Sequence, residues 1–171
     1  VAASSIGPGS PAARSGTRIA ASAPGFSVPP RLTAWSPVCE TQKAINFADQ
    51  ELNGTQYHRP ASSLLVHLEL HRSLIRRDQT DQASRIESIV EEDLQHLATV
   101  DDKLSGALHT SNADLSKRDR AAAGPAQLQA AWENVKLAGD RSRSEVLHQE
   151  LIGNIKALIG HVGDSSNLIL D

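Results

Sequence analysis

A repeating pattern of apolar residues near the C-terminal end constrains the fold most. Between residues 147 and 162 they recur at steps of three and four, at Leu147, Leu151, Ile155, Leu158 and Val162. This spacing puts them on one stripe of an α-helix, and such a stripe must be buried against other elements. Ser142 and Glu145 fit the Ser-x-x-Glu capping box, which predicts that the helix begins near Ser142.

Residues 163–167 predict the end of this helix. They comprise Gly, Asp, Ser and Asn, whose backbone freedom or short polar side chains favour turns. The apolar run Leu168–Leu170 then resumes immediately before Asp171. We therefore expect the chain to be a C-terminally truncated fragment of a longer helical domain.

Similar stripes occur upstream and predict a long first helix in two parts. The first part carries Ala44, Ile45, Ala48 and Leu52, and the second carries Leu64, Leu65, Leu68, His71, Leu74 and Ile75. Pro60 has no backbone N–H to donate and biases Arg59 away from helical geometry. We therefore expect a kink or break between Gly54 and Pro60.

Two more helices are predicted between these stripes. One runs from about Asp81 to Leu104, and another begins at Pro125 with Trp132 as its apolar anchor. Residues 105–124 are predicted to be a loop or a frayed helix end, and Gly139–Asp140 a turn. The sequence thus predicts an all-α, up-down helical bundle of about four helices with a long first helix.

Residues 1–39 differ in composition from the rest of the chain. Residues 1–38 contain no Asp or Glu and hold six of the eight prolines. Such a segment buries too little surface to offset the entropy of ordering, so we expect residues 1–39 to be disordered and residues 40–171 to form the domain. A transit peptide and a processing remnant are alternative origins for this segment.

Charge and composition disfavour several classes of function. The net charge of -3 gives no general attraction to nucleic acid or to an anionic membrane. No run approaches the roughly 20 apolar residues that span a bilayer. The single cysteine, Cys39, cannot form an internal disulfide.

Motifs for catalysis are missing from the sequence. It holds no Gly-rich phosphate loop, no Gly-x-Ser-x-Gly and no Cys-x-x-Cys, so we expect no enzymatic activity and no cofactor. His67 and His71 have the spacing of two zinc ligands on a helix. The metalloprotease motif, however, needs Glu where Leu68 stands, and no third ligand can be assigned. We predict no metal site.

Polar residues on or beside the apolar stripes are the candidates for ligand binding. A polar group inside a bundle needs a partner, and bundles receive ligands at such interior positions. An alternative is that these residues pair with one another and fix the helix register. The candidates are Tyr57, Arg59, His71, Arg72, His161 and Asp164.

Two segments resemble a known family. Residues 45–74, INFADQELNGTQYHRPASSLLVHLELHRSL, and residues 157–171, ALIGHVGDSSNLILD, resemble the extracytoplasmic helical sensor region of bacterial methyl-accepting chemotaxis proteins. Similar regions occur in sensor kinases and diguanylate cyclases. The resemblance covers about residues 40–171. In the family, a membrane helix precedes the first segment, and Pro-Asp-Leu-Asp and two tyrosines follow the second.

The resemblance implies a noncatalytic sensory input domain of a transmembrane receptor. It further implies a small-molecule ligand, a homodimer formed through helices, and membrane attachment through segments outside this chain. This portion would then be periplasmic, on a protein of the bacterial inner membrane. The alternatives are the input domain of a histidine kinase or diguanylate cyclase, and a soluble helical-bundle interaction protein.

Overall fold

The structure is a computed structural model and describes residues 35–168. The described residues from Ser36 onward form one compact unit. The described part contains helices and no strand, which confirms the predicted all-α fold. The helices are α1 (Trp35–Arg76), α2 (Thr80–Leu108), α3 (Asn112–Ser116), the 3₁₀ helix η1 (Ala121–Ala123), α4 (Pro125–Lys136) and α5 (Arg141–Ser165).

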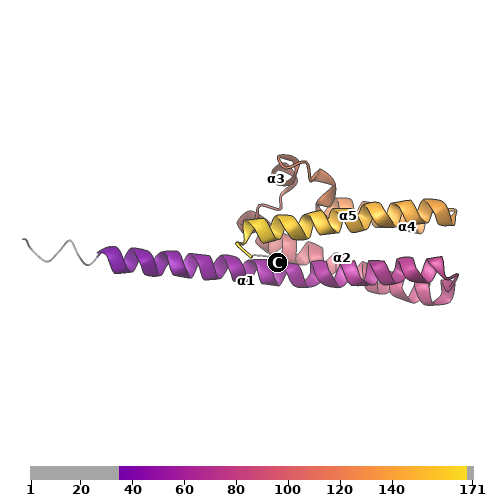
Figure 1. Cartoon of the computed structure of the whole chain (residues 1–171), viewed down its shortest axis with the longest axis horizontal. Coiled ribbons are helices and arrows are strands. Elements are labelled where there is room, and N and C mark those ends of the chain that lie inside the picture. Colours follow the sequence, from indigo (N-terminus) through magenta and orange to yellow (C-terminus); the bar gives the residue numbers. More distant parts are fainter. Residues whose placement is uncertain (1–34, 169–171) are drawn as a thin grey trace, which may run out of the picture. The chain divides into compact units, whose positions relative to one another are not determined.

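Four of these helices form an up-down bundle (Figure 1). α1 and α2 are antiparallel and joined by a short turn at residues 77–79. α4 packs against both α2 and α5. Residues 105–124, predicted as a loop or frayed helix end, contain the last turn of α2, the short α3 and η1. The predicted N-terminal disorder concerns residues that mostly lie outside the described part, and the boundary after residue 39 falls within α1.

α1 is one continuous helix of 42 residues, so the predicted break between Gly54 and Pro60 is wrong. Pro60 lies inside the helix and cannot donate to the carbonyl four residues earlier, a loss that costs roughly 3 kcal/mol. Core residues flank it on the same face: Tyr57, Ala61 and Leu64 are all fully buried. Their burial against the bundle outweighs the local preference of proline for a helix end.

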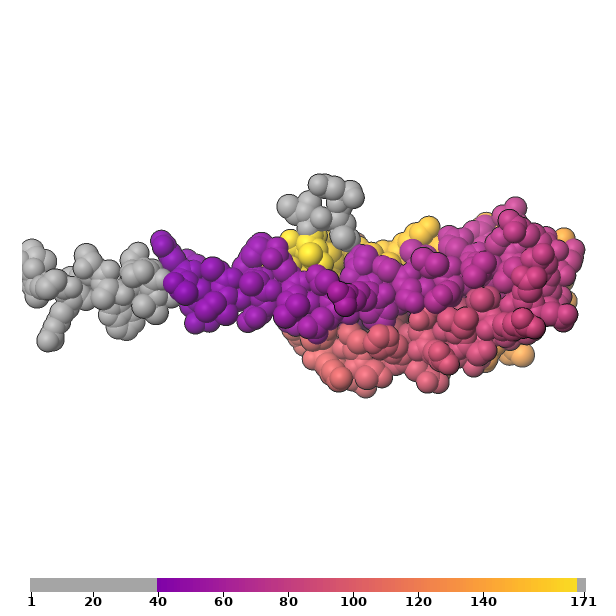
Figure 2. Space-filling model, turned by 90° about the horizontal axis from the view of Figure 1, so that it is seen from below, coloured from indigo at the N-terminus to yellow at the C-terminus, as the bar shows by residue number. Residues whose placement is uncertain are grey.

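The first part of α1 is exposed. Every residue from 40 to 50 is exposed, and this part of the helix projects past the other helices of the unit (Figure 2). Ile45, Phe47 and Leu52 are large apolar side chains that are about half exposed there. The described helices include none that is long and apolar enough to cross a membrane.

α5 begins one residue before the predicted position, but with a different cap. The Asp140 side chain accepts a hydrogen bond from the Arg143 N–H at 2.8 Å, and Asp140 is the N-cap. The predicted capping box of Ser142 and Glu145 is therefore wrong, and Glu145 instead faces α1. The helix ends at Ser165, as the turn-forming residues 163–167 predict.

The core lies among α1, α2, α4 and α5. Trp132 of α4 is fully buried, as its predicted role as an anchor requires. The stripes predicted on α1, α2 and α5 supply most of the remaining apolar side chains of the core, including Leu64, Leu68, Val90, Leu94, Leu97, Leu151, Ile155, Leu158 and Val162.

Gly54 permits a close approach between α1 and the end of α5. A methyl group at Gly54 would overlap the Ser166 hydroxyl and would lie 2.8 Å from Leu168 Cδ1. Ser166 is itself fully buried, and its hydroxyl donates to the carbonyl oxygen of Val162 at 2.7 Å. Gly54 thus permits a helix–helix contact and does not mark the start of the predicted helix break.

We predict that Gly54→Ala destabilises the protein, because α1 and the end of α5 must separate to admit the methyl group. Overpacking of this kind lowers the free energy of unfolding by about 1–3 kcal/mol, which urea unfolding measures. Gly153→Ala in α5 is the matched control, since a methyl group there meets no atom within 4 Å. That change should stabilise the protein by about 0.5–1 kcal/mol. Equal effects of the two substitutions would contradict the close approach.

Candidate functional site

Polar residues occupy the core stripes of three helices at one level of the bundle. His71 lies three residues after Leu68 on α1, and His148 lies three residues before Leu151 on α5. Both histidines are almost fully buried, with exposures of 3% and 1%. Glu87 lies three residues before Val90 on α2 and faces His71. The two histidines thus occupy core positions, and Glu87, whose side chain is 37% exposed, lies at the edge of the same polar layer.

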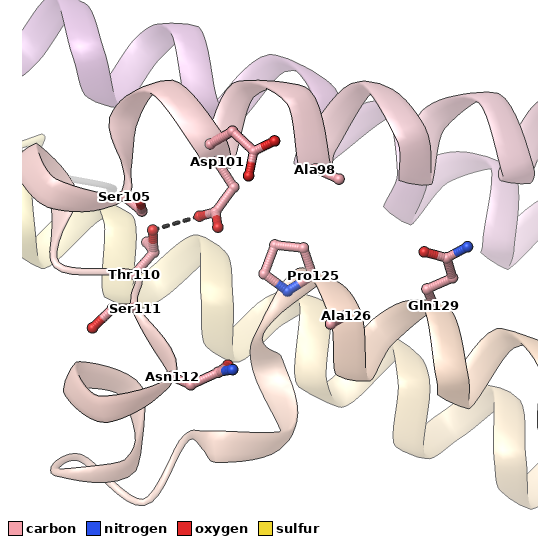
Figure 3. Close-up of a pocket in the computed structure, with 10 residues that line it drawn as sticks. Ala98, Asp101, Ser105, Thr110, Ser111, Asn112, Pro125, Ala126 and Gln129 are labelled. Atoms are coloured by element: carbon pink, nitrogen blue, oxygen red, sulfur yellow. Dashed lines mark hydrogen bonds between the residues drawn. The ribbon is translucent and has the colours of Figure 1, made fainter.

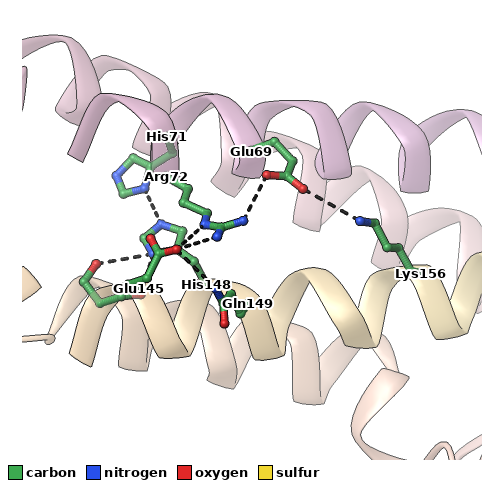
Figure 4. Close-up of polar contacts among 8 residues, drawn as sticks. Glu69, His71, Arg72, Glu145, His148, Gln149 and Lys156 are labelled. Atoms are coloured by element: carbon green, nitrogen blue, oxygen red, sulfur yellow. Dashed lines mark hydrogen bonds and ion pairs between the residues drawn. The ribbon is translucent and has the colours of Figure 1, made fainter. Parts of the chain in front are cut away.

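The two histidines are hydrogen-bonded to each other. His71 Nδ1 lies 2.8 Å from His148 Nε2 (Figure 4). His148 Nδ1 lies 2.7 Å from the Ser144 carbonyl oxygen. A carbonyl oxygen only accepts, so His148 Nδ1 carries a proton and, in the neutral ring, Nε2 accepts. His71 Nδ1 must then be the donor. The neutral His71 ring is therefore left with a lone pair on Nε2.

Apolar surroundings keep the histidine pair neutral. The Trp132 ring meets the His71 ring edge to face, with centroids 5.0 Å apart. Burial, followed by the neighbouring His148, lowers the pKa of His71 to about 4. Burial also lowers the pKa of His148, against a smaller opposing effect of its bond to Ser144. Both imidazoles are consequently uncharged at neutral pH.

An ion pair lies beside the histidines and joins the same two helices. Arg72 of α1 donates from Nε to Glu145 Oε1 of α5 at 3.1 Å, and a second guanidinium nitrogen contacts the same oxygen. The hydrogen bond to Arg72 lowers the pKa of Glu145 and raises that of Arg72. Glu69 contacts Arg72 at 3.4 Å and Lys156 at 3.8 Å (Figure 4). This network fixes the register of α1 against α5.

His71 also lines a pocket of about 260 Å³ at the end of the bundle where α1 meets α2 and α4 meets α5. Its Nε2 is buried and has no hydrogen-bond partner among the described residues. Glu87 Oε1 is 3.6 Å from this nitrogen, beyond hydrogen-bond distance. The rest of the lining includes Ile75, Asp78, Val135, Lys136, Asp140 and Arg141.

Tyr57 belongs to a different part of the bundle. Its hydroxyl donates to Asp101 Oδ1 at 2.8 Å, and Thr110 donates to the same oxygen at 2.5 Å. Burial, followed by the charge of Asp101, raises the pKa of Tyr57. Asp101 and Thr110 line a second pocket, between α2 and the start of α4 (Figure 3). The hydroxyls of Tyr57 and Thr110 both donate to Asp101, so neither is left without a hydrogen-bond partner at this pocket.

The remaining candidates do not join the His71 pocket. Arg59 is exposed. His161 is fully buried, and its Nε2 lies 2.8 Å from the His109 carbonyl oxygen. Asp164 is 3.6 Å from Arg120 and 3.9 Å from Arg118. The structure thus brings His71 and Arg72 together and places Tyr57 and His161 elsewhere.

His67 and His71 do not share a ligand position. His67 Nδ1 contacts Asp93 Oδ2 at 2.6 Å, which fixes α1 against α2, whereas His71 turns to His148. Within residues 35–168, no group of three or more His, Cys, Asp or Glu side chains is arranged to hold a metal ion.

Sequence reasoning missed Glu87, His148 and Asp101. Each lies in the continuation of an apolar stripe: Asp101 follows Leu97 by four residues, and the other two precede core residues by three. Inspecting the polar residues that lie three or four positions from the apolar residues of each stripe would have identified all three. Comparisons with protein-family models, curated proteins and solved structures found no match to this chain.

We predict that acid destabilises the protein through His71. In the unfolded chain His71 takes up a proton near its ordinary pKa of 6.5, whereas the folded protein resists this until about pH 4. Protons therefore favour the unfolded state, and stability falls as the pH drops from 6.5 toward 4. At pH 5 the expected loss is on the order of 2 kcal/mol relative to pH 7.5.

His71→Asn is the variant that checks this, because its amide N–H can replace the donor to His148 but does not titrate. Urea unfolding of both proteins at pH 7.5 and pH 5 gives the comparison. The wild-type protein should lose more stability than the variant over this range. The same pH dependence in both would show that His71 is not the source.

Proposed function

We propose that this chain is a noncatalytic sensory input domain of a bacterial transmembrane receptor, most simply a methyl-accepting chemotaxis protein. In this proposal the domain lies in the periplasm, attached to the inner membrane through segments outside residues 1–171. Two segments that resemble such sensor regions, in the family's order, support it. The all-α bundle is the architecture that the resemblance implies.

The observation that carries the proposal is the polar layer around His71. Its pocket is lined by residues of α1, α2, α4 and α5, so one small ligand there contacts all the long helices of the bundle. A change in their packing is a suitable signal, because packed helices shift between discrete arrangements. α1 runs without interruption from His71 to Trp35, about 50 Å at 1.5 Å per residue. It thus forms a continuous helical connection from the pocket to the exposed part of α1.

A second copy of the chain is the proposed partner of the exposed part of α1. Residues 42–50 of α1 are all exposed in the described part of the chain, and helices in proteins gain most of their stability from packing of an apolar face. Ile45 and Leu52 are seven residues apart, with exposures of 49% and 55%, and so recur at the same heptad position. Pairing with the same segment of another copy would bury both.

The same exposed side chains favour the second candidate function, a soluble helical-bundle interaction protein. In that case Ile45, Phe47 and Leu52 would bind a helix of a different protein. The two functions predict different coding sequences on either side of this region. The downstream sequence would also show which output domain a receptor carries.

Sequencing the coding DNA on both sides of this region tests the receptor proposal. We expect an apolar segment of about 20 residues upstream and another downstream, followed by a signalling domain. A methyl-accepting, histidine kinase or diguanylate cyclase domain would identify the output. Stop codons that bracket the region would instead favour the soluble interaction protein.

Sedimentation of the full chain tests the homodimer. The double substitution Ile45→Asn and Leu52→Asn should weaken dimerisation at least tenfold, because it removes the apolar contacts of the exposed stripe. Val146→Asn is the control, since Val146 is a similarly exposed apolar residue on α5. A wild-type chain that sediments as a monomer, or a dimer weakened equally by the control, would overturn the assignment.

A further inference from the structure

We propose that the His71 pocket binds the primary ammonium group of a small organic molecule, held between His71 Nε2 and the Glu87 carboxylate. This inference names the ligand class of the proposed sensory domain and to that extent rests on the proposed function. It is argued from the hydrogen-bonding state of His71, from the charges around the pocket and from its size.

The hydrogen bonds around His148 leave two acceptors facing each other. His148 donates to Ser144 and accepts from His71, so His71 Nε2 carries a lone pair. The nearest polar atom on α2 is Glu87 Oε1, at 3.6 Å, and a carboxylate also only accepts. A buried acceptor without a partner is costly. A group with several N–H donors on one centre satisfies both acceptors together.

The charges around the pocket favour a cation. Lys136 is engaged by Glu91 at 2.7 Å and by Glu133 at 3.0 Å, and Arg141 contacts Asp78. The ion-pair contact of Glu87 within the described part of the chain is with His71, which is neutral at pH 7. The Glu87 side chain is 37% exposed, and no Lys or Arg of the described residues pairs with it, so its carboxylate is open to a cation from solvent.

The same geometry favours an organic ammonium over a metal ion. His71 and Glu87 supply two ligand atoms, and no third His, Cys, Asp or Glu of the described residues completes a metal site. An ammonium group needs no fixed coordination sphere and has three donors. The pocket, about 260 Å³, is below the usual range for drug-sized ligands, and Ile75, Val135 and Ala138 add apolar lining. A primary amine with a short carbon chain fits these properties.

Titration of the ¹⁵N-labelled full chain with propylammonium chloride at pH 7.5 tests the inference. We expect saturable shifts of backbone signals around His71, Glu87 and Ser144. Sodium propionate and 1-propanol are probes of similar size without the ammonium group and should give none. Propionate binding in this pocket, or no saturable binding of propylammonium, would overturn the inference.

Glu87→Gln should weaken propylammonium binding at least tenfold, because it removes the charge but keeps the side-chain shape. His71→Asn should do the same by removing the Nε2 acceptor. Glu92→Gln, an exposed position on the same helix, is the matched control and should leave binding unchanged. Circular dichroism verifies that each variant is folded. If His71→Asn is unfolded, the result for Glu87→Gln alone tests the site. Unchanged affinity for propylammonium in Glu87→Gln would refute the site. The receptor proposal is tested separately, by the coding sequence on either side of this region.

Discussion

The stability of this bundle depends on how its buried polar groups are accommodated. Each buried polar group must be hydrogen-bonded or uncharged, because burial removes it from water. His71 and His148 meet this requirement by sharing a hydrogen bond and staying neutral, and Tyr57 meets it through Asp101. Each pair joins α1 to another helix, 44 or 77 residues away in sequence. The polar pairs therefore determine which levels of the helices meet, while the apolar stripes around them supply most of the burial energy.

Much of the fold could be predicted because its main signal is local. Steps of three and four identify the stripes of α1, α2 and α5 without knowledge of what covers them. The continuity of α1 could not be predicted in this way. Gly54 and Pro60 favour a break locally, but the burial of Tyr57 and Ala61 against the bundle reverses that preference. Asp140 and Ser142 both have side chains suited to an N-cap, and only the path of the chain selects Asp140.

The candidate site was predictable in part. His71 and Arg72 stand out as polar residues near the end of an apolar stripe, and the structure places them side by side in contacts with α5. Their partners, His148 and Glu145, are far away in the sequence, and one-dimensional spacing does not show which turn of α5 lies opposite α1. The orphaned nitrogen of His71 follows from the directions of two consecutive hydrogen bonds, a property of the folded chain.

The missing hydrogen bond at Pro60 has a mechanical consequence for α1. The helix lacks one link of its backbone ladder, between Pro60 and the carbonyl of residue 56, at the level of Tyr57. Its bending stiffness is lowest there, while the segments on both sides keep their full set of bonds. α1 therefore behaves as two rods with an elastic joint, and the joint lies on the buried face. A displacement of the His71 end can be taken up as a change of angle at this joint without unwinding either rod.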